Sequence, residues 1–422
     1  MTPRFDESQR GKTLLHPKLP QQRKIVPKNE GVDHGVSDET PKNHDRNKGS
    51  GNPIDDRTAS TAASVLPKVS HSFVICADTQ YGMITDNRNW DEEIEYSRKA
   101  IHFMNGMHPR PAFCCVCGDL TDMDRSFEVS KGARSRFTME ECDEVQLQQR
   151  KDFKVVWSEL HEDIALVCLC GNHDVGNRPT KRSMELYRKE FGDDYLAFWS
   201  APNVYNIVLN TTLFSASSGE ETIEEMARDQ FQWMEERLKE VRSAFSSPHH
   251  NLLKGEQPTS GQTITMSSKN DDTSNEQNNE AIIFVFGHHP WFLYDENEEP
   301  ATMSGFCEWN NSRIPDSYFV IPKERRLPHL DLFRKYGVAA SFSGHFHQNL
   351  VSETSFGMKM IVTGPLSAML ESTGKIEKKA QRHAEGLVLD EPDTLGVRLV
   401  EVLDDGSFRH EFISIVEGEK CK

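Results

Sequence analysis

Residues 113–122 read Phe-Cys-Cys-Val-Cys-Gly-Asp-Leu-Thr-Asp, an apolar run that stops at a glycine and two carboxylates. A short apolar run of this kind is typical of a central strand in a parallel sheet, where both faces are covered. Open α/β sheets hold their ligands at the carboxyl ends of such strands, because the loops diverge there. The run therefore predicts a buried strand with Asp119 at the rim of a site. By itself the pattern also fits a strand followed by an Asp-capped turn.

Other apolar runs in the chain end in the same way, which favours a site over an isolated turn. They lead into Asp78-Thr79-Gln80, Gly171-Asn172-His173-Asp174, Gly287-His288-His289-Pro290 and Ser343-Gly344-His345-Phe346-His347. Each ending places Asp, Asn, Gln or His where the backbone leaves a strand. These side chains supply the oxygen and nitrogen ligands that divalent metals take. We therefore expect a metal site built from several strand ends.

Composition limits the partners and the compartment. The chain has 422 residues and a formal net charge of −17, so it lacks the concentrated positive charge that a nucleic-acid-binding face needs. It shows no N-terminal apolar segment of the signal-peptide type and no apolar run near the ~18 residues of a membrane span. Six of the nine cysteines lie within apolar runs, which is typical of small buried side chains in a reducing compartment. We expect no nucleic-acid partner, no membrane association and a cytoplasmic location.

The distribution of polar residues predicts the domain organisation. Residues 1–69 are rich in Lys, Asn, Asp, Gly, Pro and Ser, and such a composition buries too little apolar surface to offset the entropy of ordering. We expect a disordered N-terminal tail at 1–69, one domain at 70–417 and a C-terminal tail at 418–422. Residues 246–280 have the same polar character and are expected to form a low-complexity insertion in the domain.

Within the domain, patterning predicts the order of elements. A strand from 72 to 78, an amphipathic helix at 91–107 and the strand at 113 form a strand–helix–strand unit, which implies parallel strands. Helices are also expected near 145–160, 180–191, 223–241 and 330–336, and strands at 204–214. The segments 358–363, 397–403 and 407–415 read as antiparallel strands. The charged stretch 124–143 and the polar stretch 375–393 are expected to be loops.

The strand-end motifs, taken in order, resemble those of the calcineurin-like metallophosphoesterases over roughly residues 72–416. The phrases at 77–82, 171–177 and 191–195 are further similar to a narrower group within that superfamily, the cytosolic serine/threonine-protein phosphatases with a calcineurin-like domain. The resemblance implies an α/β fold of the α+β sandwich type. Two packed mixed β-sheets would be flanked by helices, with the metal site at the carboxyl ends of the strands.

The resemblance also implies two divalent metal ions about 3.5 Å apart. Asp119 would bridge the two ions. The remaining ligands would be Asp78, Gln80 and His347 for one ion and Asn172, His288 and His345 for the other. A hydroxide between the metals would attack phosphorus in line, and His173 would protonate the departing alkoxide. Asp122 would orient the imidazole of His173 and favour its charged form.

Some residues depart from the family pattern or leave alternatives open. The first motif usually carries His where this chain has Gln80, and an amide oxygen is a weaker, harder ligand, so the metals could be Mn or Mg as well as Fe or Zn. Met123 stands where many protein phosphatases carry a phosphate-binding Arg, which makes Arg178 and Arg325 candidates for that task. His289 is an alternative to its neighbour His288 as a ligand.

The function expected from these features is hydrolysis of phosphomonoesters, with phosphoserine and phosphothreonine in proteins as substrates. A phosphodiesterase or a small-molecule phosphatase is the alternative within enzymes, because the same metal core serves both. A scaffold that keeps the fold with a catalytically weak site is a third possibility, which Gln80 suggests. The expected partner is accordingly a phosphorylated protein or a small phosphoester.

Overall fold

The computed structural model describes residues 67–132, 135–215, 220–246, 281–310, 312–384 and 392–416. Residues 1–66 of the expected N-terminal tail, residues 247–280 of the expected insertion and the expected C-terminal tail lie outside the described residues. The limits of the domain at 70 and 417 therefore stay predictions.

The first sheet has the strand order β13-β12-β1-β2-β3. β1, β2 and β3 run parallel, whereas β12 pairs antiparallel with β1 and with β13. Their bounds are Val69–Cys76 (β1), Phe113–Cys117 (β2), Ala165–Leu169 (β3), Gly396–Leu403 (β12) and Phe408–Ser414 (β13). All five residues of β2 are buried, as the apolar run predicted.

The second sheet has the strand order β10-β11-β9-β6-β5-β4. Its four inner strands are parallel, and β10 and β4 form antiparallel edges. The bounds are Leu196–Ala201 (β4), Val204–Val208 (β5), Ile282–Phe286 (β6), Val338–Ser343 (β9), Leu350–Glu353 (β10) and Lys359–Val362 (β11). The prediction for 358–363 was half right, because β11 is antiparallel to β10 but parallel to β9. A separate hairpin joins β7 (Phe306–Trp309) to β8 (Ser312–Pro315).

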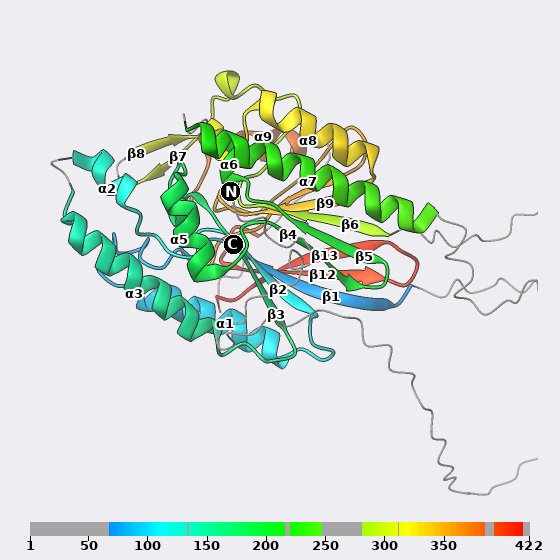
Figure 1. Cartoon of the computed structure of the whole chain (residues 1–422), viewed down its shortest axis with the longest axis horizontal. Helices are drawn as coiled ribbons and strands as arrows, with labels where there is room; N and C mark the ends of the chain where they lie inside the picture. The colour runs from blue at the N-terminus through cyan, green and yellow to red at the C-terminus, as the bar shows by residue number, and fades with distance from the viewer. Residues whose placement is uncertain are drawn as a thin grey trace, which may run out of the picture.

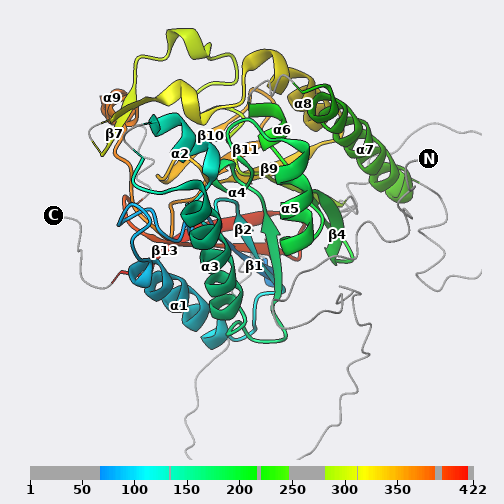
Figure 2. The same cartoon turned by 60° about the vertical axis from the view of Figure 1, so that its left-hand side comes forward.

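Helices flank the two sheets, so the chain folds as the expected α+β sandwich. Figure 1 shows α7 (Glu221–Ser246) and α8 (Lys323–Lys335) above the sheets and α1 (Asp91–Gly106) and α3 (Met139–Trp157) below them. Figure 2 brings α3 and α1 forward. The other helical segments are α2 (Arg125–Lys131), α4 (Asn172–Val175), α5 (Lys181–Phe191), α6 (Thr212–Ser215), η4 (Pro300–Thr302), η5 (Asp316–Phe319) and α9 (Thr373–Ala384).

A layer of aromatic rings fills the space between the sheets. Phe73 of β1 stacks on Phe113 of β2, with ring centroids 4.7 Å apart and planes 10° from parallel. On its other side Phe73 meets the rings of Phe284, Phe286 and Phe342 from the second sheet at 5.4–5.9 Å. All five side chains are fully buried. The layer holds the strand ends of both sheets at a fixed separation.

The cysteines follow the alternation of the strands. Cys115 and Cys117 belong to the layer between the sheets, whereas Cys168 and Cys170 belong to the core under the helices. Two cysteines two residues apart therefore share one face of their strand. All eight cysteines among the described residues are free and buried, so they act as small apolar side chains.

Three stretches that we expected to be loops or strand contain helix. The stretch 124–143 contains α2 and the start of α3, which begins with a capping box in which Thr138 and Glu141 exchange side-chain and backbone hydrogen bonds. Most of 375–393 that the structure describes belongs to α9, where Ser372 Oγ accepts from the backbone N–H of Lys375. Residues 212–215 form α6 in place of the end of a strand. In the first two stretches the polar residues that suggested a loop instead cap a helix or lie on its exposed face, whereas at 212–215 the chain forms a short helix that is largely buried.

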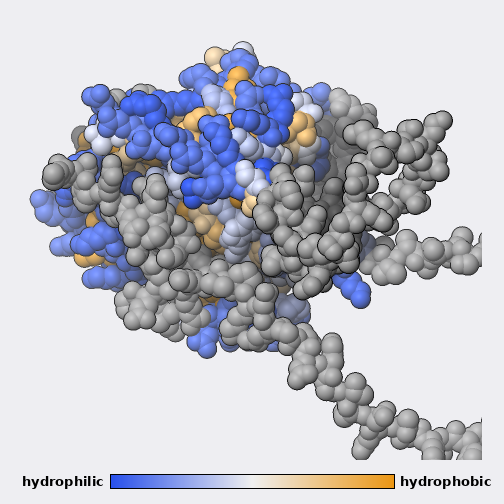
Figure 3. Space-filling model, turned by 45° about the vertical axis from the view of Figure 1, so that its right-hand side comes forward, coloured by the Kyte–Doolittle hydropathy of each residue, from blue (hydrophilic) through white to orange (hydrophobic). Residues whose placement is uncertain are grey.

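The face drawn in Figure 3 is polar where its described residues are visible. On the face in Figure 3 the described residues are mainly hydrophilic, and apolar side chains show only in small groups. Within the described ranges, no helix combines the length and the apolar character needed to cross a bilayer. On that face the apolar side chains do not gather into one large patch.

Replacing Phe73 tests how far the aromatic layer stabilises the fold. We expect Phe73→Ala to lower the free energy of unfolding by about 3–5 kcal/mol, because it opens a cavity among four other rings. The measurement is urea unfolding followed by circular dichroism. Val155→Ala on α3, where the side chain is 61% exposed, is the control and should change the free energy by less than about 0.5 kcal/mol. Equal effects of the two variants would contradict the role of the layer.

Candidate metal centre

The site lies where five parallel strands, β1, β2, β3, β6 and β9, end on one edge of the sandwich. Backbone hydrogen bonds tie the loops that follow them to one another. Asp78 N–H donates to the carbonyl of Gly118 (3.2 Å), and Gln80 N–H donates to the carbonyl of Asp119 (2.8 Å). Gly344 N–H donates to the carbonyl of His288 (3.1 Å). The polar side chains are therefore carried on loops that hold each other in place.

Five of the predicted ligands sit in left-handed backbone conformations, which non-glycine residues rarely adopt. Their φ angles are +48° for Asp78, +37° for Gln80, +49° for Asp119, +66° for His345 and +54° for His347. Each such residue costs of order 1–3 kcal/mol unless its surroundings compensate, and such residues cluster at functional sites. Strain at these positions supports a site and not a set of ordinary turns.

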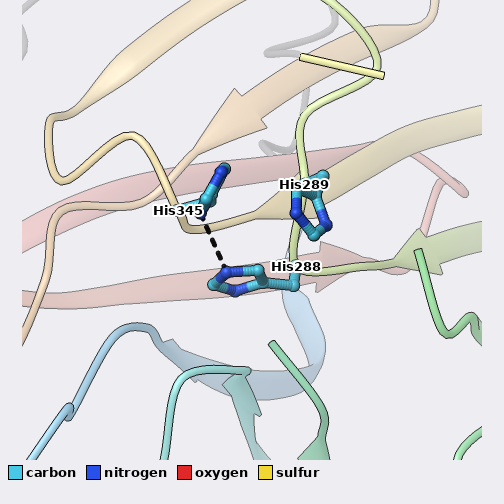
Figure 4. Close-up of side chains that lie close together, drawn as sticks. All are labelled: His288, His289 and His345. Carbon is cyan, nitrogen blue, oxygen red and sulfur yellow. Dashed lines mark hydrogen bonds between the residues drawn. The ribbon is translucent and has the colours of Figure 1, made fainter. Parts of the chain in front are cut away.

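His288 lies at the centre of one group of side chains. Its Nε2 atom is 3.0 Å from Asn172 Oδ1, 3.1 Å from His345 Nδ1 and 3.3 Å from Asp119 Oδ2. Its Nδ1 atom is 2.8 Å from the carbonyl oxygen of Cys117, which fixes the plane of the ring. Figure 4 shows His288 and His345 turned toward each other across this contact. The atoms that would bind a cation therefore face one point.

A second group forms around Asp78. His347 Nε2 lies 3.6 Å from Asp78 Oδ1, and His347 Nδ1 is 2.7 Å from the carbonyl of Ala368. The Asp78 carboxylate accepts from the backbone N–H of His345 at 2.9 and 3.0 Å. Gln80 Oε1 is buried and has no hydrogen-bond partner among the described residues. A buried acceptor without a donor is costly, so its environment suits a cation.

The two groups meet through a shared carboxylate. Ligand atoms of Asp78, Asp119 and His288 all lie within 4.8 Å of one another. Ligand atoms of His288, His289 and His345 also lie within 4.8 Å of one another. His289 is thus close enough to take part, although its Nδ1 lies 3.2 Å from Thr211 Oγ1. The donor set of carboxylate oxygens, amide oxygens and imidazole nitrogens fits hard or borderline divalent ions.

The space around these groups depends on glycine. Gly118 has φ +81°, and a side chain there would meet the ring of His288. A side chain at Gly171 would meet the Asp119 carboxylate, and one at Gly344 would meet the Asp78 carboxylate. Glycine therefore stands at these three positions because any larger residue would collide with a candidate ligand.

His173 and Asp122 form a pair beside these groups. His173 Nδ1 is 2.9 Å from the carbonyl oxygen of Asp122 and 3.2 Å from its Oδ1 atom. The Asp122 carboxylate also accepts from Gln80 Nε2 (3.0 Å) and from Asn87 Nδ2 (2.5 Å). The backbone N–H of His173 donates to Asp119 Oδ1 (2.8 Å). The pair is thus linked to both groups of ligands.

Burial and mutual charge shift the pKa values in opposite directions. Burial raises the pKa of Asp78 to about 8, against the influence of His288. Burial also opposes ionisation of Asp119, but the positive charges of His288 and His173 outweigh it and lower the pKa of Asp119. Burial lowers the pKa of His288, but the Asp119 carboxylate outweighs burial and raises this pKa to about 9. For His173, burial is likewise outweighed by Asp119 and Asp122, which raise its pKa to about 10.

The structure brings together all nine predicted site residues and adds Tyr318, which the sequence did not indicate. Tyr318 of η5 accepts from Asn172 Nδ2 (3.1 Å) and donates to Asn177 Oδ1 (2.9 Å), so it orients the Asn172 amide. Asp174 has a structural task, since its carboxylate accepts from three backbone N–H groups, those of Gly171, Leu120 and Thr121. Tyr318 lies far along the chain and outside any motif, so no sequence signal could have found it.

The centre opens into a cavity of about 660 Å³ that reaches well beyond the candidate ligands. Gln80, Asp119, His173, His345 and His347 form its floor. Its other walls carry apolar residues, among them Phe127, Phe137, Trp309 and Ile314, and the cations Arg88, Lys131 and Arg136. A volume of this size accommodates a phosphoryl group together with the molecule that carries it.

Neither arginine suggested by the sequence takes part in this cavity. Arg325 donates to Glu224 at 3.0 and 3.1 Å, and Arg178 is exposed; neither is among the lining residues. Of the lining cations, Lys131 and Arg136 both pair with Asp86, at 3.3 and 3.0 Å. The suggestion that Arg178 or Arg325 replaces the phosphate-binding arginine at position 123 therefore finds no support in the geometry.

Comparison with known proteins gives the class. The family model described as calcineurin-like phosphoesterase matches residues 71–349, which is more than half of the chain and carries every candidate ligand. The chain belongs to the calcineurin-like phosphoesterase family. The resemblance stated from the motifs is confirmed.

Individual relatives are more distant. The chain is 27% identical over 352 residues to the serine/threonine-protein phosphatase CPPED1 of Danio rerio, which covers 81% of this chain and 84% of the relative. It is 27% identical to CPPED1 of Homo sapiens over 307 residues, covering 71% of this chain and 76% of the relative. A solved dimetal phosphatase from Danio rerio aligns with a TM-score of 0.43 and 12% identity, covering 82% of this chain and 100% of that one.

The shifted pKa values predict that metal binding releases protons. At pH 7 the metal-free protein holds a proton on Asp78, with a pKa of about 8, and one on His288, with a pKa of about 9. Both ligands must lose these protons to bind a cation, so the apparent affinity for Mn²⁺ should rise as the pH rises through this range. Calorimetric titration with Mn²⁺ in buffers of different ionisation enthalpy measures the number of protons released. An affinity that is independent of pH, with no proton release, would contradict these ligands.

Proposed function

We propose that the protein is a dinuclear-metal phosphomonoesterase that acts as a serine/threonine-protein phosphatase. The observation that carries the proposal is the convergence on one buried point of Asp119, Asn172, His288 and His345, beside the second group of Asp78, Gln80 and His347. In the proposed centre Asp78, Gln80 and His347 would hold one divalent ion and Asn172, His288 and His345 the other, with Asp119 available to both groups. The two oxygens of Asp119 already face different neighbours, His173 N–H on one side and His288 Nε2 on the other.

Two bound ions would activate a water molecule and offset the negative charge of the phosphoryl oxygens. The task of the chain is to hold the substrate and to supply a proton. His173 lines the cavity, and its Nδ1 is held by Asp122, so the other ring nitrogen is available to a leaving group. The Asp122 carboxylate favours the protonated imidazole. We propose that His173 donates this proton to the departing serine or threonine oxygen.

The substrate class rests on the relatives and on the cavity. The relatives that cover most of this chain are named serine/threonine-protein phosphatases, at 27% identity. Beyond the ligands the cavity is lined by both apolar and charged side chains, which suits a phosphorylated side chain with its neighbours. A cytoplasmic location, expected from the sequence, stays a prediction. The metals would be Mn, Fe, Zn or Mg, and the oxygen of Gln80 favours the harder ions Mn and Mg.

Metal content and activity, measured on one purified sample with and without added Mn²⁺, test the proposal. We expect about two ions per chain and metal-dependent release of phosphate from a phosphoserine peptide. Asp119→Asn should lose most of the turnover and bind less metal, because one shared charged ligand is removed. Hydrolysis of only a phosphodiester or a small phosphoester would favour the alternative enzymes. Bound metal without turnover on any substrate would favour the scaffold.

Replacing His173 separates metal binding from proton donation. We expect His173→Ala to keep its metal content and to lower kcat on the phosphoserine peptide by roughly 100-fold or more. Metal analysis and steady-state kinetics on the same sample measure both. Loss of metal would show instead that the imidazole serves mainly to hold the centre together.

A further inference from the structure

The ring of Phe127 lies flat against the imidazole of His173. Their centroids are 4.4 Å apart and their planes differ by 16°, so the two rings stack face to face. Phe127 also lines the same cavity as His173. The hydrogen bond between Nδ1 of His173 and the backbone carbonyl of Asp122 fixes the imidazole at one nitrogen only. The stacked ring adds a second constraint, because it blocks rotation of the imidazole out of its plane.

The short helix α2 (Arg125–Lys131) that carries Phe127 is anchored at both ends. At its start, Asp124 Oδ1 accepts from the backbone N–H of Ser126 (2.9 Å). Near its end, the buried Glu128 accepts from Lys131 Nζ (2.5 Å) and from Ser135 Oγ (2.7 Å). Seven residues are too few for a stable isolated helix, so these contacts account for its place over the site.

Lys131 connects this helix to the loop that follows β1. Its Nζ atom lies 3.3 Å from Asp86 Oδ1, in the same loop from which Asn87 donates to the Asp122 carboxylate. Helix α2 and the partner of His173 are therefore held to one another. Phe127 approaches the imidazole from the face while Asp122 holds its edge.

We propose that Phe127 is a positioning residue that fixes the plane of the His173 imidazole for proton transfer to the leaving oxygen. The inference rests on the proposed function, since it assumes that His173 is the proton donor. Proton transfer requires the donor to be within hydrogen-bond reach and in line with the leaving oxygen. An imidazole held at one nitrogen alone would spend part of its time out of line.

The dependence of the hydrolysis rate on the leaving group distinguishes positioning of His173 by Phe127 from general support of the site. A serine or threonine oxygen leaves as a strongly basic alkoxide and needs a proton as the P–O bond breaks. A nitrophenolate is weakly basic and leaves without one. Loss of alignment should therefore slow hydrolysis of a phosphoserine peptide and leave that of 4-nitrophenyl phosphate nearly unchanged.

The test compares Phe127→Leu, Phe127→Tyr and the control Val129→Ala in the metal-loaded enzyme. Val129 lies on the same helix with its side chain 64% exposed. We expect Phe127→Leu to lower kcat on the phosphoserine peptide about tenfold and kcat on 4-nitrophenyl phosphate less than about twofold. Phe127→Tyr keeps a flat ring and should restore the rate on the peptide. Val129→Ala should match the wild type on both substrates.

Three outcomes would overturn the inference. Equal loss of kcat on both substrates, at unchanged metal content, would mean that Phe127 supports the site as a whole. A higher KM for the peptide with kcat unchanged would make Phe127 a substrate contact. A wild type that hydrolyses neither substrate would remove the proposed function and this inference with it, whereas the first two results would leave the proposed function standing.

Discussion

The structure depends on the burial of two carboxylates, Asp78 and Asp119, among imidazoles at the shared edge of two sheets. A charge removed from water must be compensated nearby, as for Asp119, or neutralised by a proton, as for Asp78 with its raised pKa, because leaving it unpaired costs several kcal/mol or more. Here each carboxylate accepts backbone N–H groups and faces His288 or His347. The same need explains the left-handed backbone at the ligands, which turns their side chains inward, and the glycines that make room for them.

The aromatic layer supplies the rigidity that this arrangement requires. Ligands from β1 and β2 belong to one sheet and those from β6 and β9 to the other, so the distance between the sheets sets the distance between the ligands. Phe73 and Phe113 on one side and Phe284, Phe286 and Phe342 on the other fill that space with stiff, closely packed rings. The helices outside then cover the remaining faces of the central strands, which is why β2 and β6 are apolar throughout.

Much of this could be predicted from the sequence because each ligand stands at the end of a strand with a strong local signal. The run at 113–117 predicted β2, and the order of the motifs predicted the family and the sandwich. Helix α2 was missed, because its seven residues are held by contacts with Asp86 and Ser135 and not by an apolar stripe. Tyr318 was missed because its contact with Asn172 joins residues 146 positions apart. Contacts of this kind arise only when the loops come together.

Gln80 connects to the His173–Asp122 pair through its side-chain nitrogen, which donates to Asp122, while its oxygen is buried without a hydrogen-bond partner among the described residues. An amide neither gains nor loses a proton at any pH at which proteins fold, whereas the histidine usual at this position does. The Gln80 side chain, which lies between the candidate metal centre and the His173–Asp122 pair, therefore stays uncharged at every such pH. No proton can therefore pass between the two sides through Gln80 itself, and the hydrogen bond from the backbone N–H of His173 to Asp119 is another connection between them.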